Sequence, residues 1–380
     1  MDMNSIDPSM ITLMDTGSEL DSLIELQNCL MNLNDTNIDE IKSTLINSEW
    51  ILTPKSIKQL AANCVLTIQY RPKQVETMAI LLSLLLNSQE RPNSPNSSPP
   101  NSKSNPKQND LSASSDSDKL QFFVSQMPKF LISAIFRGLY YNKPFPSESA
   151  HLSFLYYCFK HNVLSILEII HQIKLFIKKS VKHSRSLCWI FCYFAPEIEG
   201  ADPLVYKHLL TILHKASKRN HFPNVFREFY NNFEQLKKNN WTIFNTRRNE
   251  LSHKCTLIAK IRNDDVDFFR ELLKSPKISV DKRIYPTLYA TSPMLQSHPT
   301  LIRVAAFFGS VKTFKFFLFH HADLFARDNK LVSLPEFAVA GGNIEIIRLC
   351  QMNGLDFSSS LHYAALYHRY DILEWLHEEM

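Results

Sequence analysis

The chain has 380 residues, of which 44% are apolar, and this length predicts two or three structural units around separate cores. Only 7 residues are Gly where average usage would give roughly 27, which disfavours turn-rich β folds and Gly-rich phosphate loops. The net charge of +5 hides an acidic head, with ten Asp or Glu and one Lys in residues 1–50. It also hides a basic middle, with fifteen Lys or Arg against seven acids in residues 151–250.

The N-terminus and the apolar runs bear on location. Residues 1–4 (MDMN) have neither a basic n-region nor an apolar stretch, so no secretory signal is expected. No run of 18 apolar residues occurs, so no transmembrane segment is expected. The seven Cys residues follow no regular spacing, which favours reduced thiols. We therefore expect an intracellular, cytoplasmic protein.

Residues 1–91 are predicted to form an N-terminal helical region. Thr53 as N-cap and Pro54 at the first helical position are a strong start signal. Arg71-Pro72 should end this helix, and a very apolar helix is predicted over residues 75–86. The helix that begins at Pro54 carries one continuous apolar stripe, formed by Ile57, Leu60, Ala61, Cys64, Val65 and Ile68.

Residues 92–118 are predicted to be a disordered linker. Of these 27 residues 19 are Pro, Ser or Asn, and Leu111 is the only large aliphatic side chain. Such a segment cannot bury enough apolar area to offset the entropy lost on ordering.

Residues 119–250 are predicted to form a second helical region that contains degenerate helical repeats. No stretch keeps a period-2 alternation of apolar and polar residues, so very little β structure is expected. The predicted helices are 120–139, 152–159, 163–177, 203–217 and 224–238.

The C-terminal segment, residues 251–380, contains two copies of one phrase. Residues 305–310 read AAFFGS and residues 338–343 read AVAGGN, with 33 residues between their starts. That period is typical of ankyrin repeats, in which each unit is a turn followed by two antiparallel helices. The four predicted helix pairs are 254–261 with 265–273, 301–307 with 311–319, 335–340 with 344–351, and 361–367 with 370–377.

Small residues and turn residues support this repeat pattern. Gly309 and Gly342 stand where a first helix should end and the backbone needs a positive φ, and Asn343 extends the second of these turns. Small side chains that should let neighbouring helices approach closely stand at Ala305, Ala306, Ala338, Ala340, Ala364 and Ala365.

The repeat pattern also predicts where a partner would bind. Residues 274–299 form a long insertion between the first and second helix pairs, and such insertions project on the turn side of an array, where partners bind. We expect contact residues on this insertion and on the finger and inner-helix side, namely Tyr285, Tyr289, Arg303, Lys330 and Glu336.

The chain resembles a large family of ankyrin-type proteins of trichomonad protists whose domain has no assigned function. The similarity is carried by residues 261–266 (IRNDDV), 305–310, 338–343 and 367–372 (YHRYDI), and by Arg71-Pro72 in the N-terminal half. The resemblance implies an interaction module with no known catalysis. The usual Thr-Pro-Leu-His opening is absent, since the second pair opens with TLIR at 300–303.

Other chemistries have little support in the sequence. Cys188 and Cys192 lie near several His residues, but a Cys-x3-Cys pair without a matching second half is not a zinc motif, and Trp-Ile-Phe between them indicates core. No phosphate-binding loop, dinucleotide fingerprint or metalloprotease motif occurs. We therefore expect no catalytic, cofactor or metal residues.

The expected fold is all-α, an irregular helical N-terminal region followed by an ankyrin-like helix-turn-helix solenoid of about four repeats. The expected function is non-catalytic protein–protein interaction through the ankyrin-like surface, with a protein as partner. The alternative is a binder of anionic surfaces, either nucleic acid or acidic membrane, through the basic region 151–250. No nucleic-acid-binding motif accompanies that region, which favours the protein partner.

Overall fold

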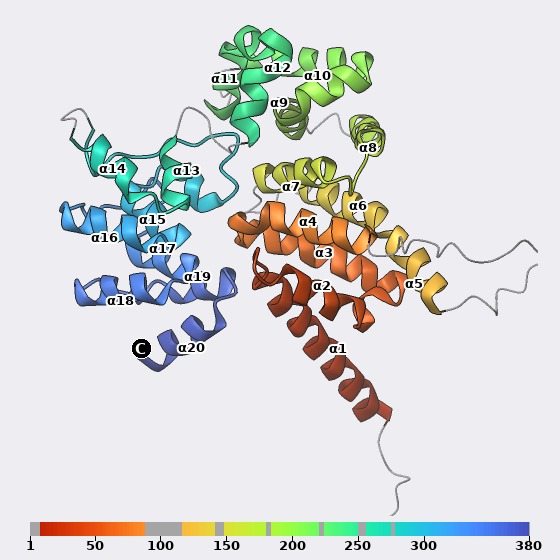
Figure 1. Cartoon of the computed structure of the whole chain (residues 1–380), viewed down its shortest axis with the longest axis horizontal. Helices are drawn as coiled ribbons and strands as arrows, with labels where there is room; N and C mark the ends of the chain where they lie inside the picture. The colour runs from red at the N-terminus through yellow and green to blue at the C-terminus, as the bar shows by residue number, and fades with distance from the viewer. Residues whose placement is uncertain are drawn as a thin grey trace, which may run out of the picture.

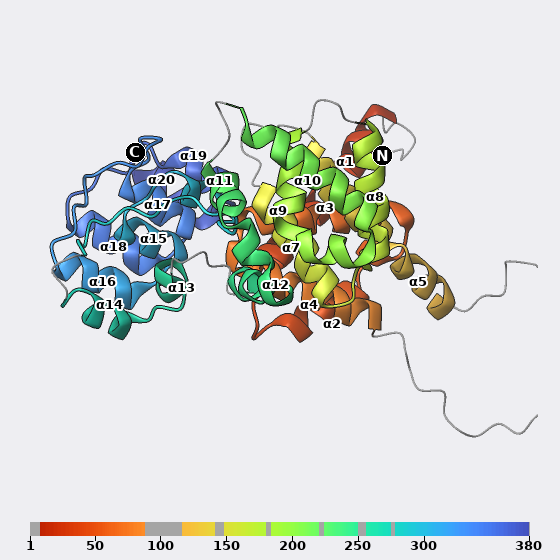
Figure 2. The ribbon, with the colours of Figure 1, turned by 90° about the horizontal axis from the view of Figure 1, so that it is seen from above.

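The computed structural model describes residues 8–87, 116–140, 148–179, 184–219, 224–249, 256–274 and 278–379. Within these ranges the chain is helical, and the only β pairing is one isolated bridge between Arg283 and Thr300. The predicted all-α class is confirmed. Figures 1 and 2 show two helical bodies side by side, one formed by α1–α12 and the other by α13–α20.

The first body begins with a layer of helices that the start and stop signals anticipate. Thr53 caps α3 in a capping box with Ser56, Pro54 opens the helix, and the helix ends before Arg71. All six residues of the predicted apolar stripe are buried. The elements of this layer are α1 (Pro8–Met31), α2 (Ile38–Ile46), η1 (Glu49–Ile51), α3 (Pro54–Tyr70), η2 (Pro72–Gln74) and α4 (Val75–Asn87).

The rest of the first body stacks on this layer. Helix α6 packs against α3, α7 packs against α4, and α9 joins α7 to the helices that follow (Figure 1). Helices from both sides of residues 92–118 therefore share one hydrophobic core. These elements are α5 (Asp116–Ser125), α6 (Met127–Tyr140), α7 (Glu148–Lys160), α8 (Ile166–Lys179), α9 (Ser184–Ala201), α10 (Pro203–Ser217), α11 (Asn224–Asn231) and α12 (Phe233–Asn249).

Several predicted helices of this body divide or shift. The predicted helix 120–139 is two helices, and 224–238 breaks at Asn232 before α12, which is itself interrupted by non-helical backbone at residues 238–241. The predicted linker 92–118 lies outside the described residues except for 116–118, which are helical and begin α5. The predicted linker therefore ends too late, because α5 begins at Asp116.

The second body consists of four helix pairs in series. Helices α13, α15, α17 and α19 contact one another in order, and α14, α16 and α18 do the same beside them. Their ends match the predicted ranges closely. The helices are α13 (Thr256–Arg262), α14 (Val266–Leu272), α15 (Leu301–Phe308), α16 (Val311–Phe319), α17 (Leu334–Gly341), α18 (Ile344–Met352), α19 (Leu361–Leu366) and α20 (Tyr370–Glu379).

The repeat residues explain how these pairs pack so closely. Gly309 and Gly342 end α15 and α17 in the left-handed conformation, with φ of 65° and 78°, and Asn343 caps α18 by accepting from the Ile346 N–H. Ala365 is exposed, so the expectation that it allows close helix packing is wrong. The other predicted small residues are buried between helices, namely Ala305, Ala306, Ala338, Ala340 and Ala364.

The insertion between α14 and α15 joins the two bodies instead of projecting from them. It contains a short 3-10 helix, η3 (Pro293–Gln296). Leu288 and Tyr289 belong to the core of the first body, whereas Ile284 and Met294 belong to the core of the second. The prediction that the insertion projects from the array is therefore wrong for residues 288–294, because their apolar side chains are buried in the cores of the two bodies.

Candidate functional site

The structure places the five predicted contact residues in two different environments. Tyr285 and Lys330 are exposed, as expected of contact residues. Tyr289, Arg303 and Glu336 are buried, so their predicted exposure is wrong. The reasons differ from residue to residue.

Tyr289 is buried because the insertion lies against the first body. Its side chain is 2% exposed, and its ring lies 5.6 Å from that of Tyr193 in an edge-on arrangement. Burial raises the pKa of its hydroxyl far above the usual value. Beside it, the Ser149 hydroxyl donates to the Ala290 carbonyl at 2.6 Å, which fixes the segment.

Arg303 and Glu336 lie in the first turns of α15 and α17, where they act within the fold. Arg303 is 0% exposed and donates to the Thr300 hydroxyl at 2.8 Å. Burial lowers its pKa to about 10, and the Asp328 carboxylate opposes that shift. Glu336 accepts from the Ser333 N–H in a capping box at the start of α17. Neither side chain is available to a partner.

An exposed edge of the second body carries large apolar side chains. We call it the finger edge and define it as residues 279–285 of the insertion with residues 323–331 of the loop between α16 and α17. Tyr285 is 72% exposed, Phe325 73% and Leu331 70%. Large apolar side chains that stay exposed on one edge are a feature found at interaction sites, so this edge is a candidate site.

Hydrogen bonds tie the two segments of the finger edge together. The Arg283 guanidinium donates to the Arg327 carbonyl at 2.8 Å, and Arg327 donates to the Leu331 carbonyl at 2.9 Å. The Asp281 carboxylate accepts from the Asp323 N–H at 2.7 Å. The three exposed apolar side chains are therefore carried by one connected backbone framework.

Leu331 has an unusual backbone for its residue type. Its φ is 64°, in the left-handed region that Gly adopts without cost and that a bulky residue rarely adopts. Holding Leu there costs about 1 kcal/mol, and the side chain receives no burial in return. Backbone strain of this kind clusters at functional sites.

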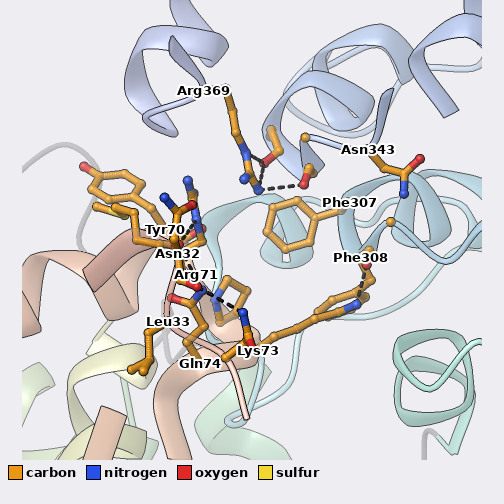
Figure 3. Close-up of a pocket in the computed structure, with 17 residues that line it drawn as sticks. Asn32, Leu33, Tyr70, Arg71, Lys73, Gln74, Phe307, Phe308, Asn343 and Arg369 are labelled. Atoms are coloured by element: carbon orange, nitrogen blue, oxygen red, sulfur yellow. Dashed lines mark hydrogen bonds between the residues drawn. The ribbon is translucent and has the colours of Figure 1, made fainter. Parts of the chain in front are cut away.

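A second candidate site is a cleft between the two bodies. It has a volume of about 420 Å3 and is lined by residues 31–34, 70–74, 307–309, 340–343 and Arg369 (Figure 3). Figure 3 shows Arg369 at the top, Arg71 at the left, Lys73 below and Asn343 at the right, around Phe307. None of the described residues that line the cleft is Asp or Glu.

Arg71 anchors the turn between α3 and α4 to the second body. Its guanidinium donates to the Tyr367 carbonyl at 2.8 Å, to the His368 carbonyl at 3.2 Å and to the Met31 carbonyl at 3.3 Å. These oxygens lie at the C-terminal ends of α19 and α1, where helix carbonyls lack partners and carry partial negative charge. Burial, and then the nearby Arg369, lower its pKa to about 9.

Lys73 and Arg369 also donate to carbonyls at the C-terminal ends of helices, those of α15 and α17. The Lys73 ammonium donates to the Phe308 carbonyl at the end of α15 at 2.5 Å. The Arg369 guanidinium donates to the Gly341 carbonyl at 2.6 Å and to the Ala340 carbonyl at 3.2 Å, both at the end of α17. Burial lowers the pKa of Lys73 and brings that of Arg369 to about 10. The Arg369 guanidinium therefore remains protonated at neutral pH.

The sequence prediction did not include these three cations as site residues. Arg71 and Arg369 stand in motifs that carry the family resemblance, yet no local pattern shows that residues 71 and 369 face one space. Only the packing of the two bodies brings them together.

The Cys pair considered for zinc lies inside the first body. Cys188 and Cys192 are buried in α9, and Trp189, next to Cys188 on the helix, packs edge-on against Phe226. Burial raises the pKa of the Cys188 thiol to about 11 and raises that of Cys192 well above its usual value. Both therefore stay as neutral thiols in the core. No group of three His, Cys, Asp or Glu side chains in the described ranges is arranged to hold a metal ion.

Comparisons with known proteins do not assign the chain to a family. No family model matches it, and no curated protein matches it. Among the described helices, none is long and apolar enough to cross a membrane.

Proposed function

We propose that this chain is a non-catalytic protein-binding scaffold of the ankyrin-repeat type that uses the finger edge to hold an acidic partner. The observation that carries the proposal is the group of exposed apolar side chains, Tyr285, Phe325 and Leu331, on one hydrogen-bonded edge. The helix pairs α13–α20 support the repeat type, because each pair contacts the next and α15 and α17 end in left-handed Gly.

The charge of the finger edge defines the partner. Its exposed cations are Lys282, Arg283, Arg327 and Lys330, against the carboxylates of Asp281 and Asp323 at the surface. A partner that places acidic residues around two or three apolar anchors would complement this edge. Such complementarity raises the association rate and selects the partner, while the apolar anchors supply most of the affinity.

The test is selection of random peptides on the full-length chain, followed by affinity measurements on the enriched peptides. We expect acidic peptides that contain aromatic or aliphatic anchors. Phe325→Ser combined with Leu331→Ser should weaken their binding by about tenfold or more, since buried anchors each contribute more than about 1 kcal/mol.

The matched control is Leu204→Ser, which alters an equally exposed apolar side chain on α10 in the first body, 78% exposed. It should leave peptide affinity unchanged. Peptides that bind the double variant as tightly as the unaltered chain would place the contact elsewhere, and a selection without an acidic consensus would remove the stated partner chemistry.

The alternative function, binding of anionic surfaces through residues 151–250, has weaker support. Five basic side chains of this region are held by carboxylates within the chain, which lowers the charge available to an anionic surface. The pairs are Lys160 with Glu76, Lys174 with Asp202, Arg185 with Glu148, Lys237 with Glu199 and Arg248 with Glu197.

A further inference from the structure

The cleft between the two bodies holds more positive charge than its surroundings neutralise. Arg71, Lys73 and Arg369 bring three positive charges, and the helix C-termini that they contact belong to α1, α15, α17 and α19. Each helix end carries about half an elementary negative charge at most, so the four offset about two of the three charges.

The N-terminus of α18 adds to the positive charge that faces the cleft. Asn343 lines the cleft as the N-cap of this nine-residue helix, whose N-terminus carries about half a positive charge. The carboxylate of Asp264 acts on Lys73, but it lies outside the cleft lining and is engaged by the Lys312 and Thr313 N–H groups. About one to two positive charges are therefore left for an occupant of the cleft.

Hydrogen-bond donors remain free in the same cleft. The Lys73 ammonium uses one of its three N–H bonds on the Phe308 carbonyl. The Nη1 of Arg369 and the Nδ2 of Asn343 have no acceptor among the described residues, because Arg369 bonds through Nε and Nη2 and Asn343 through Oδ1. The residues that carry these donors line the cleft from three separate elements, so an anion in the cleft has donors on more than one side.

We propose that this cleft is a phosphate-binding site in which Lys73, Arg369 and Asn343 contact the anion. A phosphate group carries −1.5 to −2 charges at neutral pH and offers several acceptor oxygens, which matches the residual charge and the free donors. Arg71 positions the wall by joining α3 to α19. Tyr70, Phe307 and Phe308 also line the cleft, and their rings would contact the organic part of a phosphomonoester.

The experiment is calorimetric titration of the full-length chain with inorganic phosphate and, separately, with phenyl phosphate at low salt. Saturable one-to-one binding is expected. Tighter binding of phenyl phosphate would identify an organic phosphomonoester as the ligand, and equal binding would identify the free anion; both support the site. No saturable binding of either probe at millimolar concentration would overturn it.

Two variants locate the binding. Lys73→Gln removes one donor and one charge, and Asn343→Asp places a carboxylate on the wall while keeping the N-cap, since Asp caps helices as well as Asn. Each should weaken phosphate binding by about tenfold, the effect of one lost charge-assisted contact. Lys218→Gln, an exposed charge at the end of α10, should change it by less than about twofold.

The controls separate folding from binding and this site from the finger edge. Circular dichroism and the Tm without phosphate report whether each variant is folded. A folded Asn343→Asp chain that binds phosphate as tightly as the unaltered chain would overturn the proposal. The Phe325→Ser and Leu331→Ser chain should bind phosphate normally, because the finger edge lies outside the cleft.

Discussion

At the scale of single residues, Gly342 is held by two constraints at once. Its φ of 78° is left-handed, and a Cβ built on it would lie 2.4 Å from Nε and Cζ of Arg369. The same guanidinium binds the Ala340 and Gly341 carbonyls. Because Gly342 has no Cβ, the Arg369 guanidinium can lie close enough to cap the C-terminal end of α17.

The substitution Gly342→Ala is expected to cost more stability than Gly354→Ala. Gly354 has a similar φ of 70°, but its added Cβ would have no heavy atom of the described residues within 4 Å. The left-handed backbone should cost both variants about 1 kcal/mol. Gly342→Ala should lose a further 1–3 kcal/mol, roughly, through the displaced Arg369 contacts. Urea unfolding measures both, and equal losses would contradict the contact.

Residue-level exposure is where the sequence prediction failed most. The positions of Arg303 and Glu336 in the first turns of two helices were predicted correctly, yet both side chains are buried. Helical periodicity tells which residues share a helix face, but it cannot tell which face a loop from elsewhere in the chain will cover. The finger-edge residue Phe325 was missed for a different reason: it lies in the loop between α16 and α17, where no helical period indicates exposure.

At the scale of elements, local signals carried most of the information. Helix ends are set by hydrogen bonds within a few residues, as at Thr53-Pro54 for α3 and at Ser333 with Glu336 for α17. The left-handed Gly residues end α15 and α17 in the same local way, and the predicted ranges of α13–α20 are nearly right. The buried path of the insertion was not predictable in this way, because its apolar side chains pack on residues of the first body.

The adjacent residues Ala364 and Ala365 of α19 test the packing between helix pairs. Ala364 is buried in α19, which contacts both α17 and α20, while Ala365 faces solvent. Ala364→Leu should cost about 1–3 kcal/mol by overpacking, whereas Ala365→Leu should stay within about 0.5 kcal/mol of the unaltered chain. Thermal or urea unfolding measures both losses, and similar losses for the two variants would mean that Ala364 is not closely packed against its neighbouring helices.

At the scale of the whole molecule, the two bodies meet through three kinds of contact. Arg71 and Lys73 reach helix ends of the second body, the Tyr70 ring packs edge-on against Tyr367 at 5.5 Å, and the insertion supplies Tyr289 to the first core. None of these pairs is close in sequence, so the cleft that they enclose could not be predicted from local patterns.

Tyr289→Ala is expected to destabilise the chain by about 3–5 kcal/mol, since it empties a fully packed aromatic position. Tyr285→Ala, on the same segment but exposed, should cost less than about 0.5 kcal/mol. Chemical denaturation followed by circular dichroism compares the two. If the two variants unfold alike, the insertion does not join the bodies.

The course of the insertion decides how this protein can be dissected. Leu288 and Tyr289 are covered by the first body, and Ala290 and Met294 by the second. A C-terminal fragment cut at about residue 250 would expose the apolar side chains of Leu288 and Tyr289 to solvent. The N-terminal fragment would expose the apolar surface that these two side chains cover. Binding measured on such truncated chains would include non-specific association through this newly exposed apolar surface. Point substitutions in the intact chain avoid that effect and are the better way to identify its partners.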